Sequence, residues 1–315
     1  MEEKIFNLLG NYSYSRLEKY INCPYAFKLR YIDGNYPTST SLALGVGTLL
    51  HKVNEYICSR IIKGIPIDYP KILDYIENAG NTDVSLDLDS EKKDEGISGT
   101  KILQREFFED WLTTDTKSHK SMKAKVNDFI ENIHSLEDSF KNSEWQPYKT
   151  EESFCFQYKG VTFKGNIDRI DINTKTGDLR VIDYKTKDKP FDKKDLATPL
   201  QFVIYAMAVM EKFGKLPVEF IYDLPLIHET QNGGTKGFIE RGEKKITSLL
   251  ENITSDLENN EFKPKAGPLC YWCDFNKQNP NAQGEYKNLC PYYCKWTPTD
   301  KTFDVNQVYG KKFIL

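Results

Sequence analysis

Two aspartates and a lysine lie in two short strand-like runs near the middle of this 315-residue chain. Asp168 stands in GNIDRIDI, and Asp183 and Lys185 stand in LRVIDYKTKD, with fourteen residues between the two aspartates. Carboxylate and carbonyl oxygens are the ligands that Mg²⁺ and Mn²⁺ prefer. Asp168, Asp183 and the main-chain carbonyl of Tyr184 therefore predict a site for such a cation on a hairpin.

Lys185 adds a positive charge to this pattern. It follows Asp183 by two residues, so in a strand both side chains project from the same face. A lysine beside a metal-bound water and a scissile phosphate can orient the nucleophile and stabilise charge in the transition state. The pattern predicts phosphodiester cleavage. The alternative is an ordinary solvent-facing charge pair, which is the commoner case for an isolated D-x-K.

Further motifs precede and follow these strands in a definite order. They are SYSRLEKYINCPYAFKLRYI, LGVGTLLHKVNEYI from Leu44 to Ile57, a helix-like run LQFVIYAMAV, and a closing cysteine cluster. Together with the aspartate blocks, this order resembles the RecB-family branch of the PD-(D/E)xK nucleases. That branch includes the exonuclease domains of bacterial recombination helicases and the CRISPR-associated RecB-like exonucleases.

The resemblance implies a fold and a set of roles. The fold is an α/β PD-(D/E)xK restriction-endonuclease-like core, a mixed central sheet flanked by helices. Asp168 and Asp183 would be the acidic metal ligands, Lys185 the catalytic lysine, and His51 a further metal ligand on a helix that begins near residues 47–49. Ile167 stands where the superfamily's name expects proline, a departure that RecB-like members often share. The alternative for His51 is a structural histidine on a helix face.

The resemblance also gives a role to Gln201 and Tyr205. Four residues apart on a helix, they match the family's Q-x-x-x-Y element, which orients the lysine or contacts the nucleic-acid backbone. The alternative is that both residues serve helix packing alone.

Seven cysteines form the second group of chemically capable residues. The segment MEEKIFNLLGNYSYSR lacks the apolar core of a signal peptide, so we expect a cytoplasmic protein with reduced thiols. Clustered thiols then suggest a metal. The C-x-x-C and C-x-x-x-C pairs formed by Cys270 with Cys273 and Cys290 with Cys294 are sufficient for a local structural zinc site.

The family resemblance implies a different cysteine set. In that family one cysteine in a C-P-x-x-F context joins three near the C-terminus to hold a 4Fe-4S cluster, and Cys23 stands in CPYAF. The implied ligands are Cys23, Cys270, Cys273 and Cys290, although the interval between Cys273 and Cys290 is longer than usual. Either metal would be structural, since four thiolates leave no open position. We expect the other two cysteines, Cys58 and Cys155, to be small buried hydrophobes.

The composition agrees with a globular domain. The chain is 39% hydrophobic and 28% charged, with a net charge of −3, and its longest apolar run, Phe202–Met210, is too short to cross a bilayer. A nuclease of this charge needs a basic path only along its groove. Candidate lysines for that path, or for an ordinary solvated surface, are Lys117, Lys120, Lys123, Lys125, Lys187, Lys189, Lys193 and Lys194.

We predict one RecB-like nuclease domain over residues 1–315. A helical insertion spans 64–150, with helices at 102–112 and 120–140, and a cysteine-rich region spans 262–298 and joins Cys23. Between them we expect strands at 151–158, 161–172, 178–186 and 218–226, and helices at 199–213 and 240–259.

The sequence thus predicts a Mg²⁺- or Mn²⁺-dependent deoxyribonuclease, an exonuclease on DNA ends or single strands in repair, recombination, or phage or CRISPR DNA processing. DNA is the expected partner, with a helicase or a recombination or adaptation protein beside it and no membrane. Two alternatives use the same fold, a catalytically silent nucleic-acid-binding module and a redox-responsive metal-cluster protein.

Overall fold

A computed structural model of the chain describes residues 10–37, 42–77, 86, 117–277, 279, 284–296 and 303–310. Within these, the side chains of residues 42–44, 77, 117–122, 293–296 and 303–310 are not described. The chain divides into two compact units. Unit 1 consists of Met1–Ser39, Cys155–Gly165 and Glu243–Leu315, and unit 2 consists of Thr40–Phe154 and Asn166–Gly242.

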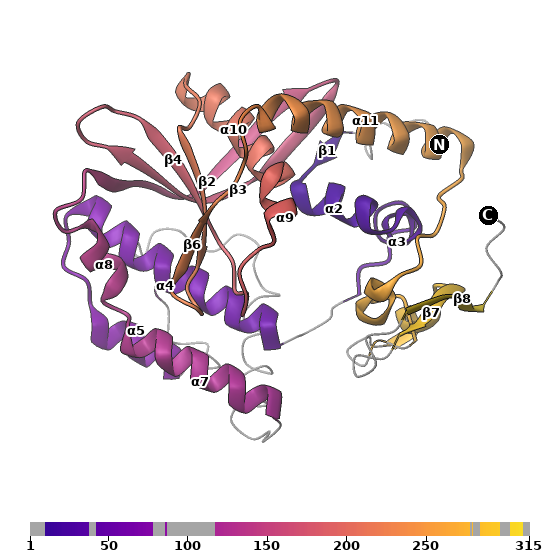
Figure 1. Cartoon of the computed structure of the whole chain (residues 1–315), viewed down its shortest axis with the longest axis horizontal. Coiled ribbons are helices and arrows are strands. Elements are labelled where there is room, and N and C mark those ends of the chain that lie inside the picture. Colours follow the sequence, from indigo (N-terminus) through magenta and orange to yellow (C-terminus); the bar gives the residue numbers. More distant parts are fainter. Residues whose placement is uncertain are drawn as a thin grey trace. The chain divides into compact units, whose positions relative to one another are not determined.

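A mixed β-sheet forms the centre of unit 2 (Figure 1). β3 pairs antiparallel with β4, β4 pairs parallel with β5, and β5 pairs antiparallel with β6, while β2 also pairs with β3. The strands are β2 (Trp145–Tyr158), β3 (Val161–Asn173), β4 (Leu179–Tyr184), β5 (Glu219–Leu224) and β6 (Glu229–Asn232). Five of the six residues of β4 are buried, as a central strand covered on both faces requires.

Helices cover both faces of this sheet. α4, α5, α7 and α8 lie on one side, and α10 lies on the other (Figure 1). The helices of unit 2 are α4 (Leu42–Lys63), α5 (Tyr69–Glu77), α7 (Lys117–Glu131), α8 (Ser135–Phe140), α9 (Lys193–Ala197) and α10 (Leu200–Phe213). α4 shares one apolar core with α5 and α7, in which Val53, Ile72 and Phe129 are buried. α10 is apolar almost all round and buried, and it ends at Gly214, whose φ of 70° suits a left-handed C-cap.

Unit 1 contains the ends of the described chain. β1 (Asn11–Tyr12) pairs parallel with the first residues of β3, and β2 and β3 meet there in a hairpin whose turn residues Lys159 and Gly160 have positive φ. The other elements are α2 (Tyr14–Asn22), α3 (Pro24–Phe27), the π-helix η1 (Lys28–Ile32), α11 (Phe238–Asn259, from Glu243 onward), the 3₁₀ helices η2 (Pro268–Trp272) and η3 (Gly284–Asn288), and the antiparallel pair β7 (Tyr292–Trp296) and β8 (Phe303–Gly310).

The predicted architecture, a mixed sheet flanked by helices, is confirmed. The predicted helix at 120–140 is two helices, α7 and α8, because residues 132–134 form a turn. The first long strand begins at Trp145, six residues before the predicted start, and β1, β6, β7 and β8 were not predicted. The predicted helix at 102–112 lies outside the described residues, and the single-domain organisation stays a prediction. Among the described helices, none has the length and apolar character that a membrane span requires.

Candidate metal centre

Asp168 and Asp183 meet where β3 and β4 pair. Arg169 lies opposite Ile182 in the antiparallel register, so the next position brings Asp168 opposite Asp183. The Asp168 carboxylate accepts a hydrogen bond of 2.8 Å from the Tyr184 N–H, which fixes one of its oxygens against the end of β4. The hairpin geometry thus places both aspartates at one end of the sheet.

Asp183 is 1% exposed and surrounded by polar partners. Its Oδ1 accepts hydrogen bonds from Gln201 Nε2 at 2.7 Å and from Tyr205 Oη at 3.4 Å, and its Oδ2 lies 2.6 Å from Lys185 Nζ. Gln201 Nε2 also lies 2.8 Å from Tyr205 Oη. The helical pair therefore contacts the same carboxylate that Lys185 contacts.

α4 brings His51 to the same end of the sheet. His51 Nε2 lies 3.1 Å from the carbonyl oxygen of Tyr184, and His51 Nδ1 lies 3.6 Å from Asp168 Oδ2. A carbonyl oxygen only accepts hydrogen bonds, so Nε2 carries the proton, and Nδ1, on the side of Asp168, carries the lone pair that can bind a cation. The predicted ligands His51, Asp168 and the Tyr184 carbonyl therefore lie close together.

Glu151 also reaches this centre, and the sequence analysis missed it. One ligand atom each from His51, Glu151 and Asp168 lie within 4.8 Å of one another, which is close enough for one ion. Asp183 is not part of that group, since its two oxygens are directed to Lys185, Gln201 and Tyr205.

An irregularity in β2 explains why Glu151 points here. Glu151 has a φ of 45°, in the left-handed region that a non-glycine residue rarely adopts. Before it the buried residue is Pro147, whereas after it the buried residues are Phe154 and Phe156, so the inward positions change from odd to even numbers. One extra residue in a strand produces this change, as in a β-bulge.

The bulge lets two successive side chains face α4. The hydroxyl of Thr150 lies 3.0 Å from that of Ser59 on α4, and Glu151 lies beside His51, about two helical turns before Ser59 on the same helix. In a regular strand successive side chains would point to opposite faces. The sequence carried a weak signal at most, because Glu151 and Glu152 are adjacent and simple alternation cannot tell which one faces inward.

Burial shifts the protonation equilibria of these groups. The pKa of Asp168 and of Asp183 is raised to about 6 and that of Glu151 to about 7, chiefly by burial. Neighbouring carboxylates contribute to the rise for Asp183 and Glu151. Burial also lowers the pKa of His51, so the imidazole is neutral and able to bind a metal. A bound cation would stabilise the ionised forms of these buried carboxyl groups, because it compensates their negative charge.

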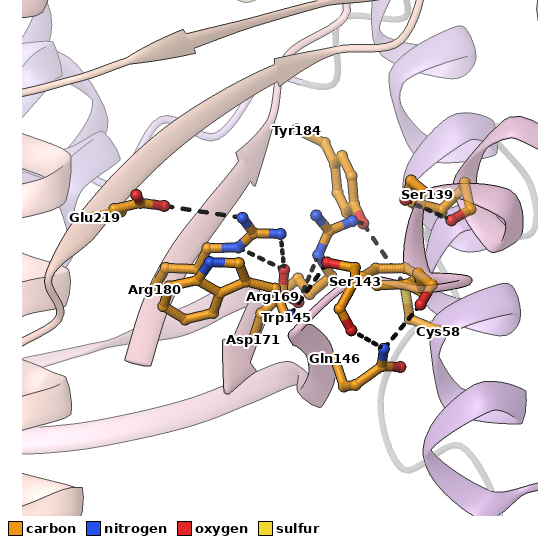
Figure 2. A network of polar contacts seen from close by, with 12 residues as sticks. Cys58, Ser139, Ser143, Trp145, Gln146, Arg169, Asp171, Arg180, Tyr184 and Glu219 are labelled. Atoms are coloured by element: carbon orange, nitrogen blue, oxygen red, sulfur yellow. Dashed lines mark hydrogen bonds and ion pairs between the residues drawn. The ribbon is translucent and has the colours of Figure 1, made fainter. Parts of the chain in front are cut away.

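A buried polar network supports Tyr184 from behind (Figure 2). Arg169 Nη1 donates a hydrogen bond of 2.6 Å to Tyr184 Oη, and Arg169 Nε lies 3.0 Å from the carboxylate of Asp171. Arg180 holds the other Asp171 oxygen at 2.9 Å, and Cys58 Sγ of α4 lies 3.9 Å from Tyr184 Oη. Cys58 is buried, as predicted, and burial raises its pKa to about 11, so the thiol is protonated.

Four cysteines of unit 1, Cys23, Cys270, Cys273 and Cys290, line one cavity of about 160 Å³. Burial raises the pKa of Cys273 to about 11 and that of Cys290 to about 12, so thiolates there need a compensating cation. Main-chain N–H groups of Lys265 and Gly267 point at the sulfurs of Cys23 and Cys270, at 3.3 and 3.4 Å. This donor set suits a metal or metal cluster.

Two cysteines differ from the expected picture. Cys155 is exposed, whereas the prediction was a buried residue, because it alternates with the inward-facing Phe154 and Phe156 in β2. The backbone of Cys294 lies in β7, but its side chain is outside the described residues, so the zinc alternative is not tested.

Sequence comparison identifies the family of the chain that carries this candidate site. A family model described as the PD-(D/E)XK nuclease superfamily matches residues 11–278. The chain belongs to the PD-(D/E)XK nuclease superfamily. The predicted resemblance is thereby confirmed, and members of this superfamily use divalent metals.

Named relatives include large helicase proteins. An ATP-dependent helicase/deoxyribonuclease subunit of Clostridium acetobutylicum is 27% identical over 67% of this chain and 19% of its own length, and the protein of the same name in Clostridium botulinum strain Loch Maree is 27% identical over 80% and 22%. The chain thus spans about a fifth of these relatives. The "Gene 69 protein" of Mycobacterium phage L5 is 22% identical over 87% of this chain and 97% of its own length.

Proposed function

We propose that this chain is a Mg²⁺- or Mn²⁺-dependent deoxyribonuclease, and that it acts as an exonuclease on DNA ends or single strands. The observation that carries the proposal is the convergence of His51, Asp168 and the Tyr184 carbonyl beside the pair formed by Asp183 and Lys185. Membership of a nuclease superfamily and the deoxyribonuclease subunits among its relatives support the same activity.

The proposed ligands are His51, Asp168, Asp183, the Tyr184 carbonyl and Glu151. A bound divalent cation would supply a water of lowered pKa and neutralise charge on the phosphate. Asp183 would share its carboxylate between the cation and Lys185, which lies at 2.6 Å. Gln201 and Tyr205 hold the other Asp183 oxygen, so they keep this carboxylate in one orientation.

Lys185 would supply the positive charge at the scissile phosphate. Its side chain is half-buried and its ammonium lies against a fully buried carboxylate, so it has little freedom to move. A fixed cation at the position where negative charge develops stabilises the transition state more than a mobile one does.

The decisive test is cleavage of end-labelled linear single- and double-stranded DNA, alongside closed circles, with Mg²⁺ or Mn²⁺ and without nucleotide. We expect metal-dependent degradation of linear DNA, lost in Asp183→Asn. Asp192→Asn, at a carboxylate that is 77% exposed, serves as the matched control and should cleave like the wild type. Cleavage by Asp183→Asn at the wild-type rate would refute the proposed site, and cutting of closed circles would replace exonuclease with endonuclease action.

We further propose that Cys23, Cys270, Cys273 and Cys290 hold a structural 4Fe-4S cluster. All four line one cavity, including the distant Cys23, which a local zinc site would not use.

A helicase is the proposed partner. The relatives that carry both activities in their name are about five times as long as the matching segment, so their nuclease segment belongs to a larger protein. We propose that this chain works on DNA that a helicase or a recombination protein has opened, in repair or in phage DNA processing.

A further inference from the structure

The residues just after β4 extend the catalytic face of that strand. The ladder continues one residue beyond Tyr184, because the Lys185 N–H donates a hydrogen bond of 2.8 Å to Asp223 O on β5. Thr186 faces α4, where Gly47 approaches it so closely that a Cβ on Gly47 would lie 3.3 Å from the Thr186 hydroxyl. Lys187 lies beyond the end of β4, and its contact with Phe191, which packs on Tyr222 beside Asp183, places it on the same side as Lys185.

Lys187 rests on a stack of aromatic rings. Its Nζ lies 3.9 Å from the centroid of the Phe191 ring, close enough for a cation–π interaction. Phe191 lies 4.5 Å from Tyr222, which stacks at 4.2 Å on Phe202 of α10. Tyr222 is the β5 partner of Asp183 in the sheet register, so the stack stands directly beside the catalytic strand.

The segment that carries Phe191 is fixed by a side-chain clamp. Gln231 of β6 accepts a hydrogen bond of 2.6 Å from the Phe191 N–H and donates one of 3.3 Å to the Phe191 carbonyl. Both main-chain polar groups of Phe191 are thereby satisfied. The ring under Lys187 therefore has a defined position, although it belongs to a loop.

The charge of Lys187 has no carboxylate partner among the described residues. The neighbouring acid, Asp188, is directed to Lys125 of α7 at 3.6 Å, and Lys185 takes the carboxylate of Asp183. An aromatic face attracts an ammonium but does not neutralise it. A lysine that is held in place, unneutralised and next to a catalytic lysine is suited to an anionic ligand.

We propose that Lys187 binds a backbone phosphate of the DNA strand, adjacent to the scissile phosphate at Lys185. Two residues of extended chain advance the side chain by about 6.6 Å, which is of the order of the spacing between successive phosphates of a strand. The inference rests on the proposed nuclease function and assigns the substrate strand a path from the metal centre over the Phe191 ring.

The test measures binding of a fluorescein-labelled single-stranded oligodeoxynucleotide in EDTA, across a series of salt concentrations. Each phosphate contact contributes about 0.7 to the slope of log K against log salt for a single strand. We expect Lys187→Gln to reduce that slope by about 0.7 and Lys187→Arg to retain it. Phe191→Leu should weaken binding while retaining the slope, because it frees the lysine without removing its charge.

Lys71→Gln is the matched control, since the Lys71 ammonium also lies over a ring, that of Tyr56, at 5.8 Å, but on α5. The slope for Lys71→Gln should equal that of the wild type, and the Lys187 and Lys71 variants should melt as the wild type does. An unchanged slope in Lys187→Gln, or an equal reduction in Lys71→Gln, would overturn the assignment. Because binding is measured without metal, these results stand whether or not the cleavage assay supports the nuclease.

Discussion

Tyr184 serves the candidate site through its backbone and the core through its side chain. Its N–H and carbonyl contact Asp168 and His51, while its hydroxyl accepts a hydrogen bond from the buried Arg169. The hydrogen bond of the hydroxyl therefore helps to fix the position of the Tyr184 backbone, whose N–H and carbonyl contact Asp168 on β3 and His51 on α4. Removing this hydroxyl should therefore alter metal binding, although the hydroxyl itself is not among the proposed ligands.

Tyr184→Phe tests this coupling, because it keeps the ring against His51 and removes only the hydroxyl. It leaves a buried guanidinium N–H without its acceptor, so we expect a loss of about 1–3 kcal/mol in the free energy of unfolding. We also expect a higher Mn²⁺ concentration for half-maximal cleavage. Tyr158→Phe, which removes a hydroxyl 3.1 Å from that of Thr247, should lower stability without that metal effect. Equal metal dependence in both variants would contradict the coupling.

Glu151 should make the metal-free protein sensitive to pH. Burial raises its pKa from 4.5 to about 7. A carboxyl with a raised folded pKa costs no stability below its unfolded pKa, and costs progressively more as the pH rises through its folded pKa. In EDTA, the free energy of unfolding of Glu151→Gln should therefore rise relative to that of the wild type by about 2 kcal/mol as the pH increases from about 4.5 to about 7, after allowing for partial exposure.

In saturating Mn²⁺ the wild type should be more stable than Glu151→Gln, because the ion stabilises the ionised glutamate and cannot gain the same contact from glutamine. Thermal melting of both proteins across this pH range, with and without Mn²⁺, makes the comparison. If the melting temperatures of the two proteins changed with pH in the same way in EDTA, Glu151 would be solvated. If Mn²⁺ raised both melting temperatures equally, Glu151 would not be a ligand.

At the scale of elements, the β2 bulge is the feature that brings Glu151 to α4. Lys212 at the end of α10 contacts the two residues of β2 that follow the bulge. It forms an ion pair with Glu152 and donates a hydrogen bond of 3.0 Å to the Ser153 carbonyl. Lys212→Met keeps the aliphatic stem and removes both contacts, so we expect weaker Mn²⁺ binding by isothermal titration with little change in melting temperature. Lys215→Met, which removes a contact to the Gly177 carbonyl instead, is the control. A Mn²⁺ affinity equal to that of the control would mean that the bulge holds without Lys212.

The sequence predicted those parts of the site that follow regular periods. Asp183 and Lys185 are two apart on a strand, and Gln201 and Tyr205 are four apart on a helix, so each pair meets at Asp183 as simple periodicity requires. Glu151 was not predictable in this way, because a bulge changes the alternation of β2 without leaving a glycine or proline at that position. β6 was missed because its four residues, ETQN, carry no alternating apolar pattern.

At the scale of the whole chain, Cys23 is far in sequence from the cysteines that share its cavity. A group bound by all four sulfurs would close a loop of most of the chain, and such cross-links reduce the conformational freedom of the unfolded state. The long-range tie distinguishes the iron-sulfur proposal from a local zinc site. The two proposals give opposite expectations for single cysteine variants.

Cys23→Ser should lose bound iron, the broad visible absorption of the cluster and several degrees of melting temperature, because one sulfur is missing from the set that lines the cavity. Cys294→Ser is the matched control, since its sulfur belongs only to the zinc alternative, and it should retain iron, colour and stability. Metal analysis with absorption spectra of protein purified without oxygen decides between them. Zinc in the wild type, kept by Cys23→Ser and lost by Cys294→Ser, would replace the cluster with a local zinc site and would free Cys23 from any role in metal binding.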